Sequence, residues 1–251
     1  MAEDIEIFEM KRQDHTNAII IDGFPTVGLV SSIVANYIIN IIDMEQIGVM
    51  ESDSFPPVSL VKEGEPLNPV RIYAGTRTAK NDHSVDKLVV FLSEFQPPQH
   101  MIRAIAHSML DWAKEQKCSM IISPGGLVNE NEENITPKVY GAASTKRARE
   151  LYIEPNVTPL IEGVISGVSG VLLNEGKRID YDVISFLAEA HKEYPDARAA
   201  AKVIDIINTV LLKTKVDPVP LIEEAEKIEN QIKMIQKHAT TQTNDSKAMY
   251  S

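Results

Sequence analysis

The sequence predicts an α/β protein with a largely parallel β-sheet flanked by helices. Short runs of β-branched and other apolar residues, typical of buried strands, recur along the chain. Segments with apolar residues at helical spacing separate these runs. Alternating strands and helices build parallel sheets through crossover connections, so the two observations together favour the α/β class. The 251 residues are enough for one large domain or two small ones.

The first predicted unit is a strand, a turn, a helix and a second strand. The apolar run NAIIID at residues 17–22 predicts a buried strand. A Gly-Phe-Pro turn follows, and Thr26 is placed to cap a helix at about residues 27–42. The run EQIGVME at residues 45–51 predicts the next strand. A crossover of this kind implies parallel strands.

The later elements continue the alternation. Further strands are predicted at residues 70–76, 87–93, 119–123 and 182–187, and helices at residues 98–117 and 195–213. The polar residues 128–138 predict a loop. The proline-rich residues 55–71 predict irregular or edge structure.

One stretch is long enough to raise the question of a membrane span. No charged residue lies between Asp22 and Asp43, a length that could cross a bilayer. However, the stretch opens with a Gly-Phe-Pro turn and contains two serines and two asparagines. The acidic N-terminus MAEDIEIFEM also lacks the basic region of a signal peptide. We therefore interpret the stretch as a buried helix of a soluble protein.

Composition and charge exclude several classes of function. The net charge of −11 argues against nucleic acid and anionic membranes as partners, because both attract clustered lysine and arginine. The single cysteine, Cys118, allows no intrachain disulfide, and its apolar context predicts a buried structural thiol in a reducing compartment. The six histidines show no metal-ligand spacing. We therefore expect no metal, no cofactor and no catalytic residue.

Glycines mark two further segments. The sequence DGFPTVGLV places Gly23, Pro25 and Gly28 at a strand-to-helix turn, where an anion could bind helix amides. It matches neither G-x-G-x-x-G nor a Walker loop, so a turn glycine and a helix-packing glycine are the favoured interpretation. In EGVISGVSGVLLNEG, Gly163, Gly167 and Gly170 have spacings of four and three, which on a helix would place them on one face against the sheet.

A rigid Asp-Pro-Val-Pro break at residues 217–220 separates the C-terminal part from residues 1–216, the predicted globular domain. Residues 217–238 predict a protruding helix whose apolar residues recur at steps of four, three, four and three. These seam residues are Leu221, Ala225, Ile228, Ile232 and Ile235. The helix could pack on its own domain or associate with copies of itself, and isoleucine in the seam favours more than two copies. Residues 239–251 predict a flexible tail because they are almost entirely polar or small.

Four segments together resemble the family of proteasome assembly chaperones and their archaeal relatives. They are GFPTVGLVSSIVANYII, SPGGL, EGVISGVSGVLLNEG and FLAEAHKEYPDARAAAKVIDIIN, which span roughly residues 17–212. The resemblance implies a fold like that of nucleoside phosphorylases without their chemistry. It also implies a cytoplasmic homo-oligomer that binds proteasome core particles.

The last residues agree with this resemblance. Met249, Tyr250 and Ser251 look like the hydrophobic-tyrosine-any-residue terminus of proteasome activators. By that resemblance, the tail enters a pocket between adjacent α-ring subunits, where its carboxylate pairs with a lysine. A chain end is a compact anion that a basic pocket can capture, and tyrosine offers a flat apolar face with a polar tip.

The favoured function is therefore a non-enzymatic, ATP-independent proteasome-binding protein that acts as assembly chaperone, activator or both. Two other functions stay open. One is a small-molecule enzyme, which only the analogy to nucleoside phosphorylases suggests. The other is an oligomeric scaffold for an unrelated partner.

Overall fold

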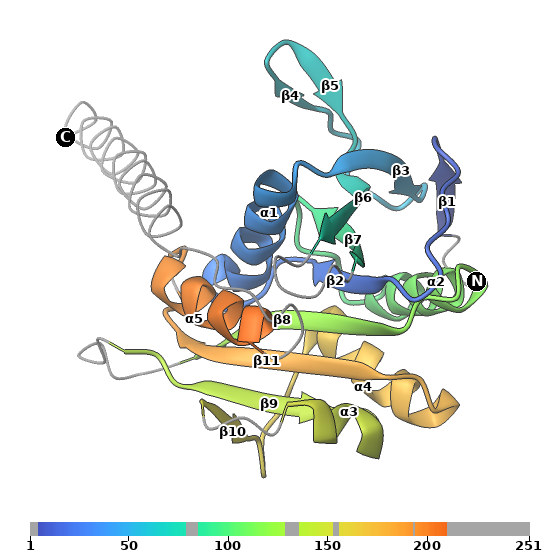
Figure 1. The fold of residues 1–251 in the computed structure, drawn as a ribbon. Helices are drawn as coiled ribbons and strands as arrows, with labels where there is room; N and C mark the ends of the chain where they lie inside the picture. The colour runs from blue at the N-terminus through green and yellow to red at the C-terminus, as the bar shows by residue number, and fades with distance from the viewer. Residues whose placement is uncertain (1–4, 79–84, 129–135, 153–155, 193, 210–251) are drawn as a thin grey trace, which may run out of the picture.

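The computed structural model describes residues 5–78, 85–128, 136–152, 156–192 and 194–209 (Figure 1). The predicted C-terminal helix and tail lie outside this part of the chain, so both stay predictions. Within it, no helix is long and apolar enough to cross a membrane. The uncharged stretch that raised the question instead forms α1 (Val30–Ile42), which packs against the sheet.

A nine-stranded sheet runs through the molecule in the order β1-β3-β6-β7-β2-β8-β11-β9-β10. Its strands are β1 (Glu6–Glu9), β2 (Ile19–Gly23), β3 (Glu45–Glu51), β6 (Val70–Thr78), β7 (Val85–Ser93), β8 (Met120–Val128), β9 (Val139–Ala143), β10 (Val157–Pro159) and β11 (Val183–Ala190). The four central strands β7, β2, β8 and β11 are parallel, and antiparallel pairs flank them on both sides. The α/β class with a mostly parallel sheet is confirmed.

Helices cover both faces of this sheet (Figure 1). The remaining helices are η1 (Val27–Leu29), α2 (Ile102–Glu115), α3 (Lys146–Leu151), α4 (Gly167–Ile179) and α5 (Ala197–Ile207). Consecutive strand residues point to opposite faces. In β2, Ile21 accordingly joins the core under α1 and α5, whereas Ile20 joins the core under α2 and α4. The result is three layers with a separate apolar core on each side of the sheet.

The crossover from β2 through α1 to β3 differs from the simplest expectation. The two strands do run in the same direction, but β7 and β6 lie between them, and β3 pairs antiparallel with β6 and β1. The proline-rich residues 55–71 contain a small hairpin of β4 (Leu60–Lys62) and β5 (Glu65–Leu67), which projects from the body (Figure 1). Its turn residues Glu63 and Gly64 both have positive φ, as a two-residue hairpin turn requires.

The turn after β2 is tighter than the predicted helix start. Gly28 and Leu29 have φ of 62° and 50°, so the regular helix begins only at Val30. The Gly28 carbonyl accepts a hydrogen bond from the Asp196 amide at 2.8 Å, and a Cβ on Gly28 would lie 3.0 Å from the His191 carbonyl oxygen. The turn is therefore packed against the start of α5, which agrees with a structural role for Gly28.

The second glycine segment differs from its prediction. Gly163 lies before α4 and is exposed, and Gly167 is the first residue of that helix, so the three glycines do not share a helix face against the sheet. Only Gly170 is buried, and a Cβ there would lie 2.2 Å from the carbonyl oxygen of Ile165. The helical spacing was misleading because α4 begins only at Gly167, so Gly163 lies in the segment before the helix.

We expect Gly170→Ala to lower the free energy of unfolding by about 3 kcal/mol, because the added methyl group must displace the backbone at Ile165. Gly167 has φ of 75° with open space around it. Because a side chain at that φ is strained, the matched control is instead Gly163→Ala. Gly163 is exposed, a Cβ there would meet only the Leu160 side chain, at 3.3 Å, and the control should melt close to the parent. Thermal unfolding measures both variants. A Gly170→Ala melting point equal to that of the control would contradict the close approach.

Candidate functional site at the carboxyl edge of the sheet

The parallel strands β7, β2, β8 and β11 end at one edge of the sheet, where open α/β sheets bind their ligands. A groove of about 640 Å³ lies at this edge. Its walls are residues 24–27 after β2, residues 126–128 of β8, residues 164–169 at the start of α4 and Leu187 of β11. Gln96, Pro97, Gln99 and Ile102, just before and at the start of α2, complete the lining. Segments far apart in the sequence thus meet at a single groove.

Among the described residues, no charged side chain lines this groove, although charged residues make up 24% of the protein. Its exposed apolar residues include Val128 and Val164, which are 47% and 85% exposed. Its polar groups are neutral and include Thr26, Gln96 and Ser166. General acid–base catalysis needs a titratable group within hydrogen-bonding reach of the substrate. The lining therefore favours contact with an uncharged apolar group over chemistry.

A buried carboxyl group lies beneath the groove. Asp22 is fully buried at the end of β2. One of its oxygens accepts the Phe24 amide at 3.0 Å, and the other accepts the Ser123 hydroxyl at 2.7 Å. The Ser169 hydroxyl lies 3.5 Å from the second oxygen and 2.6 Å from the Ser123 hydroxyl. The cluster thereby joins β2, β8 and the first turn of α4.

Burial raises the pKa of Asp22 to about 6, because the charged form loses its hydration. The three hydrogen bonds, from Ser123, Phe24 and Ser169, act in the opposite direction and only partly offset this effect. Asp22 reaches the groove only through Ser169 and Phe24, which line it. Asp22 therefore has a structural role, because its hydrogen bonds connect the turn after β2, β8 and α4 beneath the groove.

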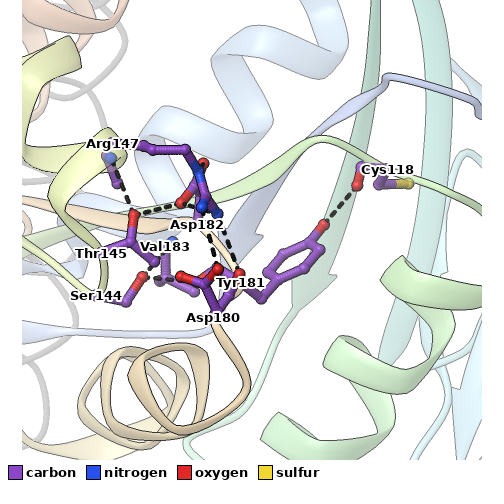
Figure 2. A network of polar contacts seen from close by, with 9 residues as sticks. Cys118, Ser144, Thr145, Arg147, Asp180, Tyr181, Asp182 and Val183 are labelled. Atoms are coloured by element: carbon purple, nitrogen blue, oxygen red, sulfur yellow. Dashed lines mark hydrogen bonds and ion pairs between the residues drawn. The ribbon is translucent and has the colours of Figure 1, made fainter.

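A second polar cluster ties the opposite end of β11 to its neighbours (Figure 2). Arg147 of α3 donates to Asp180 and Asp182 at 3.1 Å each, and both carboxylates raise the pKa of Arg147. The Thr145 hydroxyl also donates to Asp182. Each charge in this cluster therefore has a partner of opposite sign, which is typical of a structural tie.

Cys118 lies close to this cluster in space. The Tyr181 hydroxyl donates to the Cys118 carbonyl oxygen at 2.9 Å (Figure 2). Burial raises the pKa of the Cys118 thiol to about 12, so the thiolate is not populated near neutral pH. The buried structural thiol predicted from the sequence is confirmed.

The predicted site residues fall into two groups. The first group, Met249, Tyr250, Ser251 and the seam residues of the C-terminal helix, lies outside the described residues. Gly23, Pro25 and Gly28 belong to β2 or to the turn that follows it, beside the groove. Among the described residues, no group of three histidine, cysteine, aspartate or glutamate side chains could hold a metal ion.

Sequence reasoning missed the groove itself. Asp22 and Ser123 each stand at or near the end of a predicted strand, and parallel strands end at the same edge. That rule was a usable signal for their proximity. Ser169 carried no such signal, because only the position of α4 brings it to Asp22.

Comparison with known proteins then decides the family. A sequence profile described as the PAC2 family matches residues 20–236. The chain belongs to the PAC2 family. This PAC2 protein is 30% identical to Pyrococcus furiosus PbaA, described as an archaeal homolog of proteasome-assembly chaperone, with a TM-score of 0.80 over 93% of this chain and 97% of that chain.

Two further relatives agree. P. furiosus PbaB, described as an archaeal proteasome activator, is 23% identical with a TM-score of 0.77 over 94% of this chain and 100% of that chain. An uncharacterised protein from Methanocaldococcus jannaschii is 28% identical over 236 residues, which is 93% of this chain and 91% of the relative. The resemblance to proteasome assembly chaperones is confirmed, whereas the predicted likeness to nucleoside phosphorylases stays a prediction.

Proposed function

We propose that this PAC2 protein is a cytoplasmic, ATP-independent protein that binds the proteasome core particle as an assembly chaperone, an activator or both. The observation that carries the proposal is the 30% identity to PbaA over nearly the whole of both chains. The similar fold of PbaB, described as an activator, is the reason to keep both roles.

The finer part of the proposal concerns the C-terminus. Met249 and Tyr250 dock in an apolar pocket between adjacent α-ring subunits, and the Ser251 carboxylate pairs with a lysine there. A charge-assisted hydrogen bond of this kind is stronger than a neutral one, and an aromatic residue in a closed pocket is a typical source of binding energy. The groove at the carboxyl edge is not needed for this contact.

A direct test compares the full-length protein with a variant that lacks residues 249–251 in a pull-down of purified core particles. We expect the full-length protein to retain core particles and the deletion variant to retain far fewer. If neither protein retains core particles, the proposed function is wrong. If both retain them equally, only the role of the terminus is wrong.

Self-association through the C-terminal helix is part of the same proposal. Replacing Ile228 and Ile232 with aspartate buries two charges in the seam, at several kcal/mol each. Light scattering should then report a smaller particle. Lys227→Asp with Asn230→Asp adds negative charge on the opposite helix face and should leave the mass unchanged. An unchanged mass for the seam variant would instead favour a helix that packs on its own domain.

The alternative functions gain no specific support. For a small-molecule enzyme, the groove at the carboxyl edge would be the place to look, but the part of its lining that the structure describes offers no acid or base. A scaffold for an unrelated partner predicts no preference for core particles, so the same pull-down separates it from the proposed function.

A further inference from the structure

Strand β1 has one unpaired edge. It is the terminal strand of the nine-stranded sheet, and among the described strands only β3 pairs with it (Figure 1). Three of its four residues are exposed, and Phe8 alone is 48% exposed. Met10, just beyond the strand, is 64% exposed. A strand edge with exposed apolar side chains is a template for another extended segment.

The direction of the free peptide groups follows from the pairing. Met10 donates its amide to the Ile47 carbonyl at 2.7 Å, so its peptide points toward β3. Peptide groups alternate in direction along an antiparallel strand. Phe8 and Glu6, opposite Val49 and Glu51, therefore also bond toward β3, whereas Ile7 and Glu9 present their N–H and C=O groups at the open edge.

A hollow lies on each face of β1. On the α2 face, a hollow of about 980 Å³ is lined by Ile7, Glu9 and side chains of α2, and Phe8 also borders it. On the other face, a hollow of about 660 Å³ is lined by Glu6, Phe8 and residues 50–59. Side chains of a strand alternate between faces. A segment added to the edge of β1 would therefore place its side chains alternately into the two hollows.

The charges of the two hollows differ, and this difference defines the occupant. The hollow beside Glu6 contains the carboxylates of Glu6, Glu51 and Asp53 and, among the described residues, no basic side chain. The hollow beside α2 contains both signs of charge. A second copy of β1 would bring two sets of these carboxylates together in a protein whose net charge is already −11. Charge complementarity instead favours a strand with lysine or arginine on the side of Glu6.

We propose that β1 is a docking edge for an extended segment of a partner protein, with basic side chains facing Glu6, Glu51 and Asp53 and uncharged side chains facing the mixed charges beside α2. The added segment bonds to the peptide groups of Ile7 and Glu9. This surface contains none of residues 249–251, so the proposal goes beyond the proposed function.

The test uses the full-length protein and two fluorescein-labelled eight-residue peptides, one alternating lysine and valine and the other alternating glutamate and valine. Fluorescence anisotropy measures binding, and amide hydrogen exchange locates it. We expect the lysine peptide to bind and to slow exchange at Ile7 and Glu9, while Phe8, already bonded to β3, changes little. Deleting residues 249–251 should leave this binding unchanged, which separates it from the proposed function.

Charge reversal sharpens the test. Glu6→Lys with Asp53→Lys should weaken the lysine peptide about tenfold and let the glutamate peptide bind instead. Glu65→Lys with Glu162→Lys changes two exposed carboxylates that line neither hollow and is the matched control. Melting points of the variants show whether each is folded. The binding switch of the glutamate peptide is a gain that misfolding cannot produce.

Three results would overturn the proposal. The first is equal binding of the two peptides to the parent protein. The second is binding of the lysine peptide without slower exchange at Ile7 and Glu9. The third is that, without peptide, these two amides exchange more slowly as the protein concentration rises. That result would assign the edge to a second copy of the chain.

Discussion

One glycine added after Ser251 is expected to reduce stimulation of core-particle peptidase activity almost as much as deleting residues 249–251. The addition keeps every side chain but moves the carboxylate away from the lysine proposed to bind it. A charged hydrogen bond that loses one partner costs more than the bond contributed, because the lysine is left desolvated. Several tails on one oligomer would bind through effective concentration, so modest losses at each tail multiply.

Side-chain variants separate the contributions at the terminus. Tyr250→Phe removes only a hydroxyl and should cost about 1 kcal/mol of binding per tail if its hydrogen bond is made. Tyr250→Ala also removes the aromatic surface and should cost several times more. Hydrolysis of a fluorogenic peptide by purified core particles, with a parallel binding assay, measures all of these variants. An extended-tail protein that binds and stimulates like the parent would show that the carboxylate is not recognised.

The central part of the fold could be predicted from the sequence because local signals there agree. The run NAIIID, the Gly-Phe-Pro turn and the following uncharged stretch correspond to β2, its turn and α1. The run EQIGVME corresponds to β3 at residues 45–51. Buried parallel strands are apolar on both faces, so they stand out from the surrounding sequence. The position of β3 beyond β6 and β7 depends on which strands pair, and that leaves no local pattern.

The edges of the sheet were missed for a different reason. Strand β1 has only four residues, EIFE, without a clear polar–apolar alternation, and its acidic residues were considered only as evidence against a signal peptide. The short elements β9, α3 and β10 have five, six and three residues and depend on contacts with β11 and with one another. Short segments carry little periodicity of their own, and tertiary contacts decide their conformation.

The candidate site depends on long-range packing even more strongly. Ser123 and Ser169 are 101 and 147 residues from Asp22 in the sequence. The sequence places Asp22 at the end of a strand, but whether its carboxyl group faces solvent or the protein interior depends on α4. A fully buried carboxyl group with only neutral partners is therefore a property of the fold, and it makes stability depend on pH.

We expect Asp22 to make the folded protein less stable as the pH rises from about 4 to about 7. The pKa of Asp22 is about 6 in the folded protein, against 3.8 for an ordinary aspartate side chain. Between these values the folded state holds more protons than the unfolded state, so raising the pH favours unfolding. Two pKa units correspond to a loss on the order of 3 kcal/mol, complete once the pH exceeds the folded pKa. No charged group contributes to the shift, which rests on burial and on hydrogen bonds from neutral donors.

Asp22→Asn isolates this effect from every other titrating group. Its amide oxygen can accept the Phe24 amide, and its amide nitrogen can donate to Ser123, whose hydroxyl can turn toward Ser169. The variant cannot ionise at this site, so its stability relative to the parent should improve by about 2 kcal/mol between pH 4.5 and pH 7.5. Asp22→Ala leaves the same donors without an acceptor and should be less stable than Asp22→Asn at every pH. Urea unfolding across this range measures all three proteins. Parallel curves for the parent and Asp22→Asn would mean that Asp22 does not titrate in this range. The hydrogen bonds of the polar cluster beneath the groove would then fully offset the effect of burial on the pKa of Asp22.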